Sequence, residues 1–516
     1  MKTLNTISLV FLMCVMIVSC GRRGHETTRD GMSVFRRYSF FFDTTMMRSC
    51  IMETLDSDQS VFPSDMTVKK RYTDSRSFSD LPVWFSYMGL SPEADSVLFF
   101  LREALPENGL DTGLFRLPQI SDDIELVRSL AYDSVGKGIN RVMARLDYNL
   151  SRAYVAYCYG QRTGFMRPDV VFNTLEYKSD TDGKVFSRLF GYELEKMDVR
   201  DVVRMLDTHD RVSYMRQSKP VNDACRSLYA QLRECEDSAK RRVLFVNIER
   251  CRWRVRQPAA NSRHVLVNIP SLHLWTVCPD SVSQMRICCG AKKSKTPLLS
   301  SDIRYLQVNP EWIVPQTIVK SDFLRHAGDS AYFASRNYFM TNKLTGDTLE
   351  PGKVTVAQLE SGKIRIGQRS GDGNSLGRVA FRFSNDYGIY LHDTDNKRAF
   401  KYVHRTLSHG CVRVERPYDL TCFLLPAADE WMIDKIRLSM DMDPLTEKGE
   451  KYVEKHEDDE RPFRLVNYLS VSPEVPLFIF YFTAYPNPCD GKVEYWEDVY
   501  GYDDVIWKEV SYLYMR

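Results

Sequence analysis

A histidine followed at some distance by a Ser-His-Gly-Cys run is the combination of residue types in this chain best suited to chemistry. Residues 407–414 read Leu-Ser-His-Gly-Cys-Val-Arg-Val, and His392 lies upstream within Tyr-Leu-His-Asp-Thr. A cysteine attacks as its thiolate, so a catalytic cysteine needs a base or a nearby cation. Gly410, directly before Cys411, lets the backbone approach a substrate closely, and the neighbouring N–H groups can face a developing oxyanion. A base delivered from a neighbouring strand can activate such a cysteine, so this pattern makes Cys411 a candidate nucleophile and the upstream histidine a candidate base.

This motif resembles that of the L,D-transpeptidase catalytic domain, the YkuD family. Members of that family carry a histidine, a spacer of similar length, and then Ser or Thr followed by His-Gly-Cys, and the chain matches this pattern with His392 and Ser408. The resemblance implies that Cys411 is the nucleophile and His392 its base. It also implies that Ser408 orients His392 through its backbone carbonyl. His409 is then a structural or substrate-side residue of the motif, next to Gly410.

The resemblance extends to a larger, YcbB-like branch of the family. Many short bacterial members have Asn two residues after the cysteine, where this chain has Arg413. Further stretches similar to the larger branch are residues 247–250, 267–270, 295–297, 308–315, 374–379, 483–485 and 498–501. The similarity therefore spans about residues 242–503. The peptidoglycan-binding module common in this branch is not evident between Lys196 and Arg242.

The resemblance implies a reaction on the peptide stems of peptidoglycan. Cys411 attacks the carbonyl of an L,D-peptide bond in a tetrapeptide stem, and the terminal D-Ala leaves with a proton from His392. An amine of a neighbouring stem then resolves the thioester, which gives a 3→3 cross-link without a metal or an organic cofactor. Two alternatives stay open: a hydrolase on the same scaffold, in which water replaces the amine, and a non-catalytic wall-binding lipoprotein.

Two more side chains are candidates for substrate contacts. Arg413 can bind a substrate carboxylate in a bidentate manner or hold the loop through backbone contacts, and both interpretations remain. Tyr390, two residues before His392, lies on the same face of a strand, where it lines the site or packs.

A zinc site is the chemical alternative for the motif. Its possible ligands are His392, His404, His409 and Cys411. The family resemblance implies no role for zinc and His404 has no position in the motif, so we expect no metal.

The N-terminus has the composition of an exported lipoprotein. Lys2 precedes an apolar run from Leu4 to Val18 that is too short to span a bilayer comfortably. The run ends in Ile-Val-Ser-Cys, which resembles a bacterial lipobox and implies cleavage before Cys20 and lipidation of its thiol; an ordinary secretory signal is the alternative. Residues 1–20 are then the signal and residues 21–34 a tether. Because no Asp follows Cys20, we expect a periplasmic protein anchored to the inner leaflet of the outer membrane.

Composition limits the partners and the compartment. Lys and Arg together number 70 and Asp and Glu 68, so no basic excess indicates a nucleic-acid partner. The partners that the family resemblance implies are peptidoglycan tetrapeptide stems, and the lipid anchor implies the membrane. Of 13 cysteines, 11 remain after Cys14 and Cys20, an odd number that predicts at least one free thiol.

The hydrophobic pattern changes from helical to strand-like near Arg242, which predicts an α+β protein. Apolar residues recur at helical spacing in residues 95–103, 149–159 and 221–236. Short apolar runs predict strands at residues 243–246, 265–269, 272–277, 378–383, 388–392 and 476–483. We expect a helical scaffold domain at 35–242 and a mainly β catalytic domain at 243–512, with a lid-like insertion at about 321–362 and a charged connector at 441–462.

Overall fold

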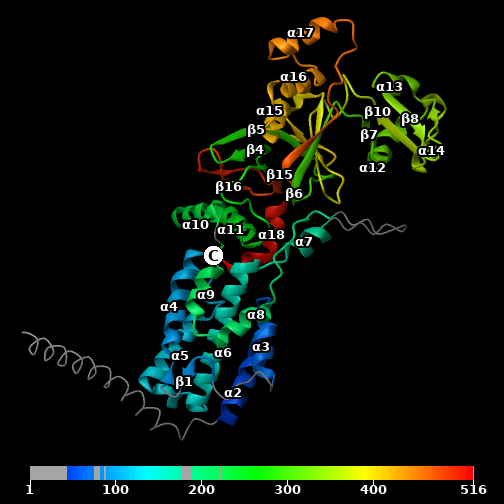
Figure 1. The fold of residues 1–516 in the computed structure, drawn as a ribbon. Helices are drawn as coiled ribbons and strands as arrows, with labels where there is room; N and C mark the ends of the chain where they lie inside the picture. Colours follow the sequence, from blue (N-terminus) through cyan, green and yellow to red (C-terminus); the bar gives the residue numbers. More distant parts are fainter. Residues whose placement is uncertain (1–43, 75–81, 87–88, 176–187, 221, 515–516) are drawn as a thin grey trace, which may run out of the picture. The chain divides into compact units, whose positions relative to one another are not determined.

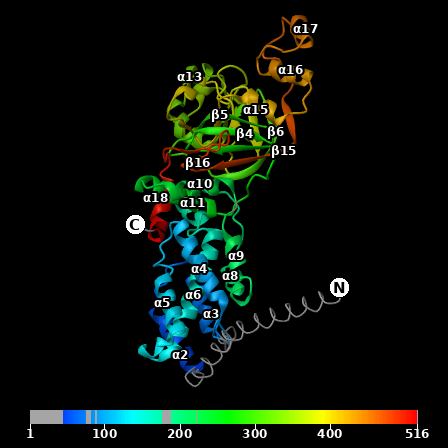
Figure 2. The same ribbon diagram turned by 90° about the vertical axis from the view of Figure 1, so that its left-hand side faces the viewer.

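The computed structural model describes residues 44–74, 82–86, 89–175, 188–220 and 222–514, so Cys20 and the expected tether lie outside the described residues. These residues form two compact units (Figures 1 and 2). The first comprises the described residues up to Arg167 together with 195–254 and those from Val505 onward, and the second comprises 168–194 and 255–504. The first is helical and the second contains the large sheet, which confirms the predicted α+β organisation.

Helix α6 (Gly138–Thr163) is the central element of the helical unit. It is buried along most of its length and packs against α2 (Thr44–Ser57), α5 (Leu117–Ser129) and α9 (Arg211–Ser218). The other helices include α3 (Asp65–Thr73), α4 (Pro92–Glu107), α8 (Val199–Arg204) and α10 (Asp223–Glu234). The helices predicted at residues 95–103, 149–159 and 221–236 are confirmed as parts of α4, α6 and α10.

Buried polar side chains on α6 bond to the start of α3 and to the segment before it. The Arg152 guanidinium donates to Asp65 Oδ2 at 3.1 Å and lies 4.8 Å from the centroid of the Phe62 ring. The Tyr148 hydroxyl donates to Asp58 Oδ2 at 2.5 Å. Because an unpaired buried charge is strongly destabilising, these contacts fix the position of α6 relative to its neighbours.

The strand predicted at residues 243–246 is wrong, because this segment lies in the middle of helix α11 (Ser238–Arg252). The helix begins at Asp237, whose carboxylate accepts from the N–H groups of Ala239 and Lys240. Its second half, from Leu244 onward, is buried on all sides. The sequence there shows no single apolar stripe, and a short apolar run without such a stripe resembles a buried strand. The domain boundary expected after Arg242 therefore falls inside a helix, and the helical unit continues to Arg254.

The second unit is built on a nine-stranded sheet that closes on itself. The strand order is β13-β5-β14-β12-β11-β6-β15-β3-β4, and β5 pairs with β4 as well. The strands are β3 (His264–Asn268), β4 (His273–Cys278), β5 (Ser281–Gly290), β6 (Leu299–Val308), β11 (Val379–Phe383), β12 (Leu391–His392), β13 (Thr406–Ser408), β14 (Val412–Val414) and β15 (Tyr468–Phe480). The predictions near β3, β4, β11 and β15 are confirmed, whereas the strand predicted at residues 388–392 is reduced to β12.

The expected insertion is a small subdomain with its own sheet and core. Its strands are β7 (Trp312–Ile313), β8 (Tyr338–Asn342), β9 (Thr348–Leu349) and β10 (Ile364–Gln368), in the order β7-β10-β8-β9. Short helices α12 (Gln316–Ile318), α13 (Ser330–Ala334) and α14 (Val356–Glu360) group around it (Figure 1). Buried Phe323, Phe333 and Met340 belong to its core. Since β7 and β10 pair at its base, the insertion spans residues 312–368 and is wider than predicted.

The charged segment 441–462 is partly helical. It follows α15 (Pro417–Leu424) and α16 (Glu430–Ser439) and contains α17 (Glu447–Lys455). Buried Asp434 on α16 accepts from the N–H groups of Leu445 and Thr446, which anchors the start of the segment. No described helix combines the length and the apolar character that crossing a bilayer requires.

Candidate active site

Two adjacent parallel strands bring the predicted nucleophile and base to one face of the sheet. Strands β12 and β14 pair with His392 opposite Arg413, and the N–H of Val412 donates to the Tyr390 carbonyl at 3.1 Å. Side chains alternate along each strand, and residues opposite each other in a pair point to the same face. Tyr390, His392, Cys411 and Arg413 therefore share one face, with His392 diagonally across from Cys411.

The Ser408 side chain holds the turn that presents Cys411. Its hydroxyl donates to the Cys411 carbonyl at 2.5 Å and accepts from the Gly410 N–H at 3.1 Å. Gly410 has a φ of 117°, a left-handed conformation that strongly favours glycine. Thr296 completes the turn by donating to the Gly410 carbonyl at 2.8 Å. The Gly410 N–H, expected to face an oxyanion, is thus occupied by Ser408 in this state.

The backbone carbonyl of Ser408 was expected to orient His392, and the structure places it differently. This carbonyl accepts from the Ala291 N–H at 2.8 Å and from the Ser294 hydroxyl at 3.0 Å. The ring of His392 instead bonds through Nδ1 to the carbonyl of Asp393. The reason is local, because the carbonyl of Asp393, the residue directly after His392, lies within hydrogen-bond reach of the His392 ring.

His392 is a buried, neutral base. Since a carbonyl only accepts, Nδ1 carries the proton and Nε2 keeps a free lone pair. Burial lowers the pKa of His392 to about 3, and the charges of Arg413 and Arg382 act in the same direction, against the Asp393 carbonyl, which raises it. At neutral pH the ring is therefore unprotonated.

Cys411 is half-buried and its thiol is protonated at neutral pH. Burial raises the pKa of Cys411 to about 11, although a backbone hydrogen bond with Tyr390 and the charges of Arg382 and Arg413 oppose this rise. The two pKa shifts together favour a neutral thiol and a neutral imidazole at neutral pH.

Two arginines make the surroundings of the thiol cationic. Arg382 lies with its guanidinium carbon 3.9 Å from the centroid of the Tyr390 ring, which is itself 5.6 Å from the His392 ring. The Nε atom of Arg413 is buried and has no hydrogen-bond partner among the described residues. An unpaired buried donor favours a ligand acceptor over the alternative in which Arg413 holds the loop.

Arg382 was not among the residues expected at the site. Its strand β11 pairs with β12 so that Ala380 lies opposite His392, which places Arg382 opposite Tyr390. The alternation of side chains along residues 378–383 shows on which side of the strand Arg382 lies. Only the pairing of β11 with β12 shows that Tyr390 is its neighbour.

The inserted subdomain contacts the turn that contains Cys411 through His409 and Asp322. His409 Nε2 lies 3.2 Å from Asp322 Oδ2, and both side chains are about one third exposed. Asp322 belongs to the π-helical turn Val319–Phe323 of the insertion. His409 is therefore the motif residue that contacts the insertion. Because its Nε2 faces Asp322, His409 is a poorer candidate for the base than His392.

His404, the possible metal ligands and the other cysteines form no further site with Cys411 and His392 among the residues that the structure describes. His404 is exposed and lies 3.7 Å from Glu497 Oε2. Within the described part of the chain, no group of three or more His, Cys, Asp or Glu residues is arranged to hold a metal ion. All 11 described cysteines are free thiols, and adjacent Cys288 and Cys289 are buried.

The structure thus places a cysteine and a histidine on a closed sheet, and two parts of the chain match known domain families. Residues 262–427 match the L,D-transpeptidase catalytic domain, also called YkuD, and residues 69–235 match a domain described as a scaffold domain. The chain therefore contains an L,D-transpeptidase catalytic domain, as its motif predicted.

Known relatives cover part of the chain. A putative L,D-transpeptidase of Haemophilus influenzae is 29% identical over 245 residues, which are 47% of this chain and 45% of that protein. The chain thus spans about half the length of this relative. The solved structure of the Ldtfm–avibactam carbamoyl enzyme is 10% identical with a TM-score of 0.22, over 64% of this chain and 80% of that one.

Proposed function

We propose that this protein is a peptidoglycan L,D-transpeptidase that forms 3→3 cross-links through a thioester on Cys411. The observation that supports this most directly is the placement of Cys411 and His392 on one face of the paired strands β12 and β14, inside the L,D-transpeptidase domain.

In the first half-reaction the tetrapeptide stem acylates the enzyme. Cys411 Sγ attacks the carbonyl carbon of the L,D-peptide bond, and its proton passes to Nε2 of His392. The C–N bond then breaks, and the departing D-Ala amine takes that proton. The N–H of Cys411 is the donor that we assign to the oxyanion, since the Gly410 N–H is bonded to Ser408.

In the second half-reaction an amine of a neighbouring stem attacks the thioester carbonyl. His392 takes a proton from this amine and returns it to the departing Cys411 sulfur, so the enzyme is restored and no cofactor is consumed. Arg382 and Arg413 provide positive charge beside the thiol for the carboxylates of the stems, and the unpaired Nε of Arg413 is a ready donor.

We further propose that the protein works in the periplasm as a lipoprotein of the outer membrane, anchored by its lipidated Cys20. The support is the Ile-Val-Ser-Cys ending of the apolar run at residues 17–20 and the absence of Asp after it.

Mass spectrometry of the intact protein after incubation with a tetrapeptide stem tests the reaction. We expect an adduct equal to the stem minus its terminal D-Ala, located on the peptide that contains Cys411. Cys411→Ala removes the adduct and the cross-linked product, whereas Cys422→Ala, which changes a half-buried thiol outside the motif, leaves both unchanged. A 3→3 product from Cys411→Ala contradicts the mechanism, and tripeptide as the sole product identifies a hydrolase.

A further inference from the structure

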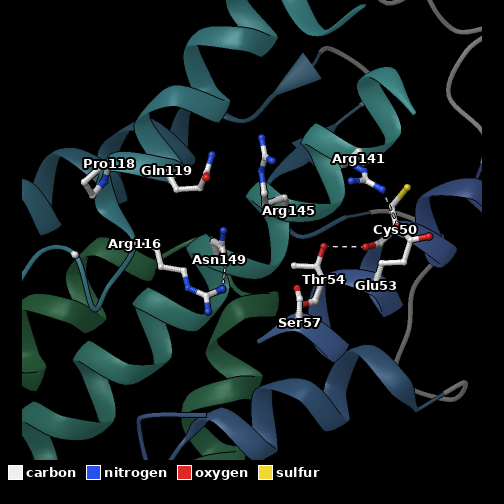
Figure 3. Close-up of a pocket in the computed structure, with 11 residues that line it drawn as sticks. Cys50, Glu53, Thr54, Ser57, Arg116, Pro118, Gln119, Arg141, Arg145 and Asn149 are labelled. Carbon is white, nitrogen blue, oxygen red and sulfur yellow. Dashed lines mark hydrogen bonds and ion pairs between the residues drawn. The ribbon is translucent and has the colours of Figure 1, made fainter. Parts of the chain in front are cut away.

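The helical unit contains an open cavity of about 530 Å³ between α2, α5 and α6 (Figure 3). Its volume is in the range of small-molecule binding sites. We call it the arginine pocket, and define it by Glu53, Arg116, Gln119, Arg141, Arg145 and Asn149. Figure 3 shows side chains from all three helices converging on this space.

Each of the three arginines bonds to neighbouring side chains through some of its N–H donors and keeps others unused. Arg145 donates through Nε to Asp123 Oδ2 at 2.9 Å, and Arg141 donates through Nη2 to Glu53 Oε2 at 2.9 Å. Arg116 donates through Nη1 to Asn149 Oδ1 at 2.9 Å. A guanidinium has five N–H donors, so each keeps some for a ligand while its existing bonds fix its orientation.

Cations outnumber carboxylates around the pocket. Glu53 is shared between Arg141 and Lys137, and Asp58, the second partner of Arg116, also lies 3.6 Å from Lys69. Glu53 and Asp58 therefore each face more than one cation, whereas Asp123 is paired with Arg145. Among the lining residues themselves, three arginines stand against the one carboxylate of Glu53, which favours an anionic ligand.

The backbone at Arg116 is held in an uncommon conformation. Its φ of 56° lies in the left-handed region, which L-residues other than glycine rarely adopt. The bonds of its side chain to Asn149 and Asp58 stabilise this conformation and point the guanidinium to the pocket.

The remaining lining indicates the class of ligand. No residue lining the cavity, all of them in the described part of the chain, is aromatic, so a platform for stacking a sugar ring is absent. Gln119, Asn149, Thr54 and Ser57 add amide and hydroxyl groups. Guanidinium groups with amides and hydroxyls match a peptide that carries several carboxylates.

We propose that the arginine pocket binds an acidic peptide through its carboxylates, and that this peptide is a peptidoglycan stem. The identity of the peptide rests on the proposed function, since that function brings stems to the protein. A second stem-binding site on the helical unit would retain the polymer during reaction at Cys411.

Calorimetric binding to the full chain carrying Cys411→Ala, in which no thioester forms, tests the proposal. The probes are a tetrapeptide stem with free carboxylates, the same peptide with its carboxyl groups converted to amides, and inorganic phosphate. We expect Arg141→Gln combined with Arg145→Gln to weaken binding of the free-acid stem by about tenfold or more, because charge-assisted hydrogen bonds are lost. The matched control is Arg128→Gln on α5, whose exposed partner is Asp95 and which does not line the cavity.

Arg145→Gln leaves the buried carboxylate of Asp123 without its cation, so this variant risks misfolding. Ser57→Asp avoids the problem by adding a carboxylate to the lining while retaining every arginine, and we expect a similar loss of affinity.

Equal dissociation constants for Ser57→Asp and the parent, or for the free-acid and amidated stems, overturn the proposal. Tighter binding of phosphate than of the stem at this pocket overturns the assignment to a peptide. Acylation of Cys411 is measured separately in the chain that retains this cysteine. If acylation fails while the pocket still binds the free-acid stem, the proposed reaction is wrong and the binding site stands.

Discussion

His409 and Asp322 join the inserted subdomain to the catalytic turn, with 3.2 Å between Nε2 and Oδ2. His409 is two residues before Cys411, whereas Asp322 belongs to a subdomain with its own sheet and core. This partly exposed contact links the insertion to the turn that contains Cys411.

Loss of this ion pair should have a modest effect. A partly exposed pair contributes about 0.2–1 kcal/mol, so we expect Asp322→Asn to slow acylation of Cys411 by less than about fivefold. Hydrogen exchange in the turn Val319–Phe323 should become faster. Asp347→Asn is the control, because it removes an exposed carboxylate from the same subdomain. Exchange in Asp322→Asn that matches the control contradicts a role of this pair in holding the insertion.

Removal of His392 should have a much larger effect on acylation. With a neutral imidazole beside a protonated thiol, the enzyme depends on His392 to take the proton during attack. We expect His392→Ala to slow acylation of Cys411 by on the order of 10²-fold or more, the usual scale for a positioned base. His404→Ala, an exposed histidine beside Glu497, should change the rate far less. A larger loss at His404, measured by mass-spectrometric time courses, would assign the base differently.

Alkylation of Cys411 should depend steeply on pH. A pKa raised to about 11 means that the protonated thiol predominates below that pH. The thiolate fraction then falls about tenfold for each pH unit below the pKa and is on the order of 10⁻⁴ at pH 7. We expect the rate of iodoacetamide labelling, followed on the peptide containing Cys411, to rise continuously from pH 7 to pH 10. A plateau near neutral pH would show a preformed thiolate–imidazolium pair.

Anchoring by lipid should depend on Cys20. The apolar run before this residue ends like a lipobox, and acyl chains on its thiol and amine would hold the protein at the membrane. We expect Cys20→Ser to abolish labelling by a fatty-acid analogue and to release the protein to the soluble periplasmic fraction. The parent and Cys14→Ser should both be labelled, since Cys14 lies inside the signal. A parent protein without label would contradict the lipoprotein assignment.

The amphipathic helices were predictable from the sequence, and the fully buried one was not. In α4 and α10 apolar residues recur on one stripe because the opposite face meets water. The second half of α11 is buried on every side, so its composition resembles that of a buried strand. Strands β5 and β6 were missed for a related reason, because polar residues such as Gln284 and Asp302 interrupt their apolar pattern.

The sequence alone predicted which residues act as nucleophile and base, because the chemistry of a thiol and an imidazole belongs to the residue types and their spacing is local. Tertiary structure decided what surrounds them: Arg382 comes beside Tyr390 through strand pairing, Asp322 beside His409 through the insertion, and Asp393 replaces Ser408 as the partner of His392. It also decided their protonation, since burial by residues distant in the chain shifts both pKa values toward the neutral forms. Burial and pairing are properties of the folded chain, which is why no local pattern could reveal them.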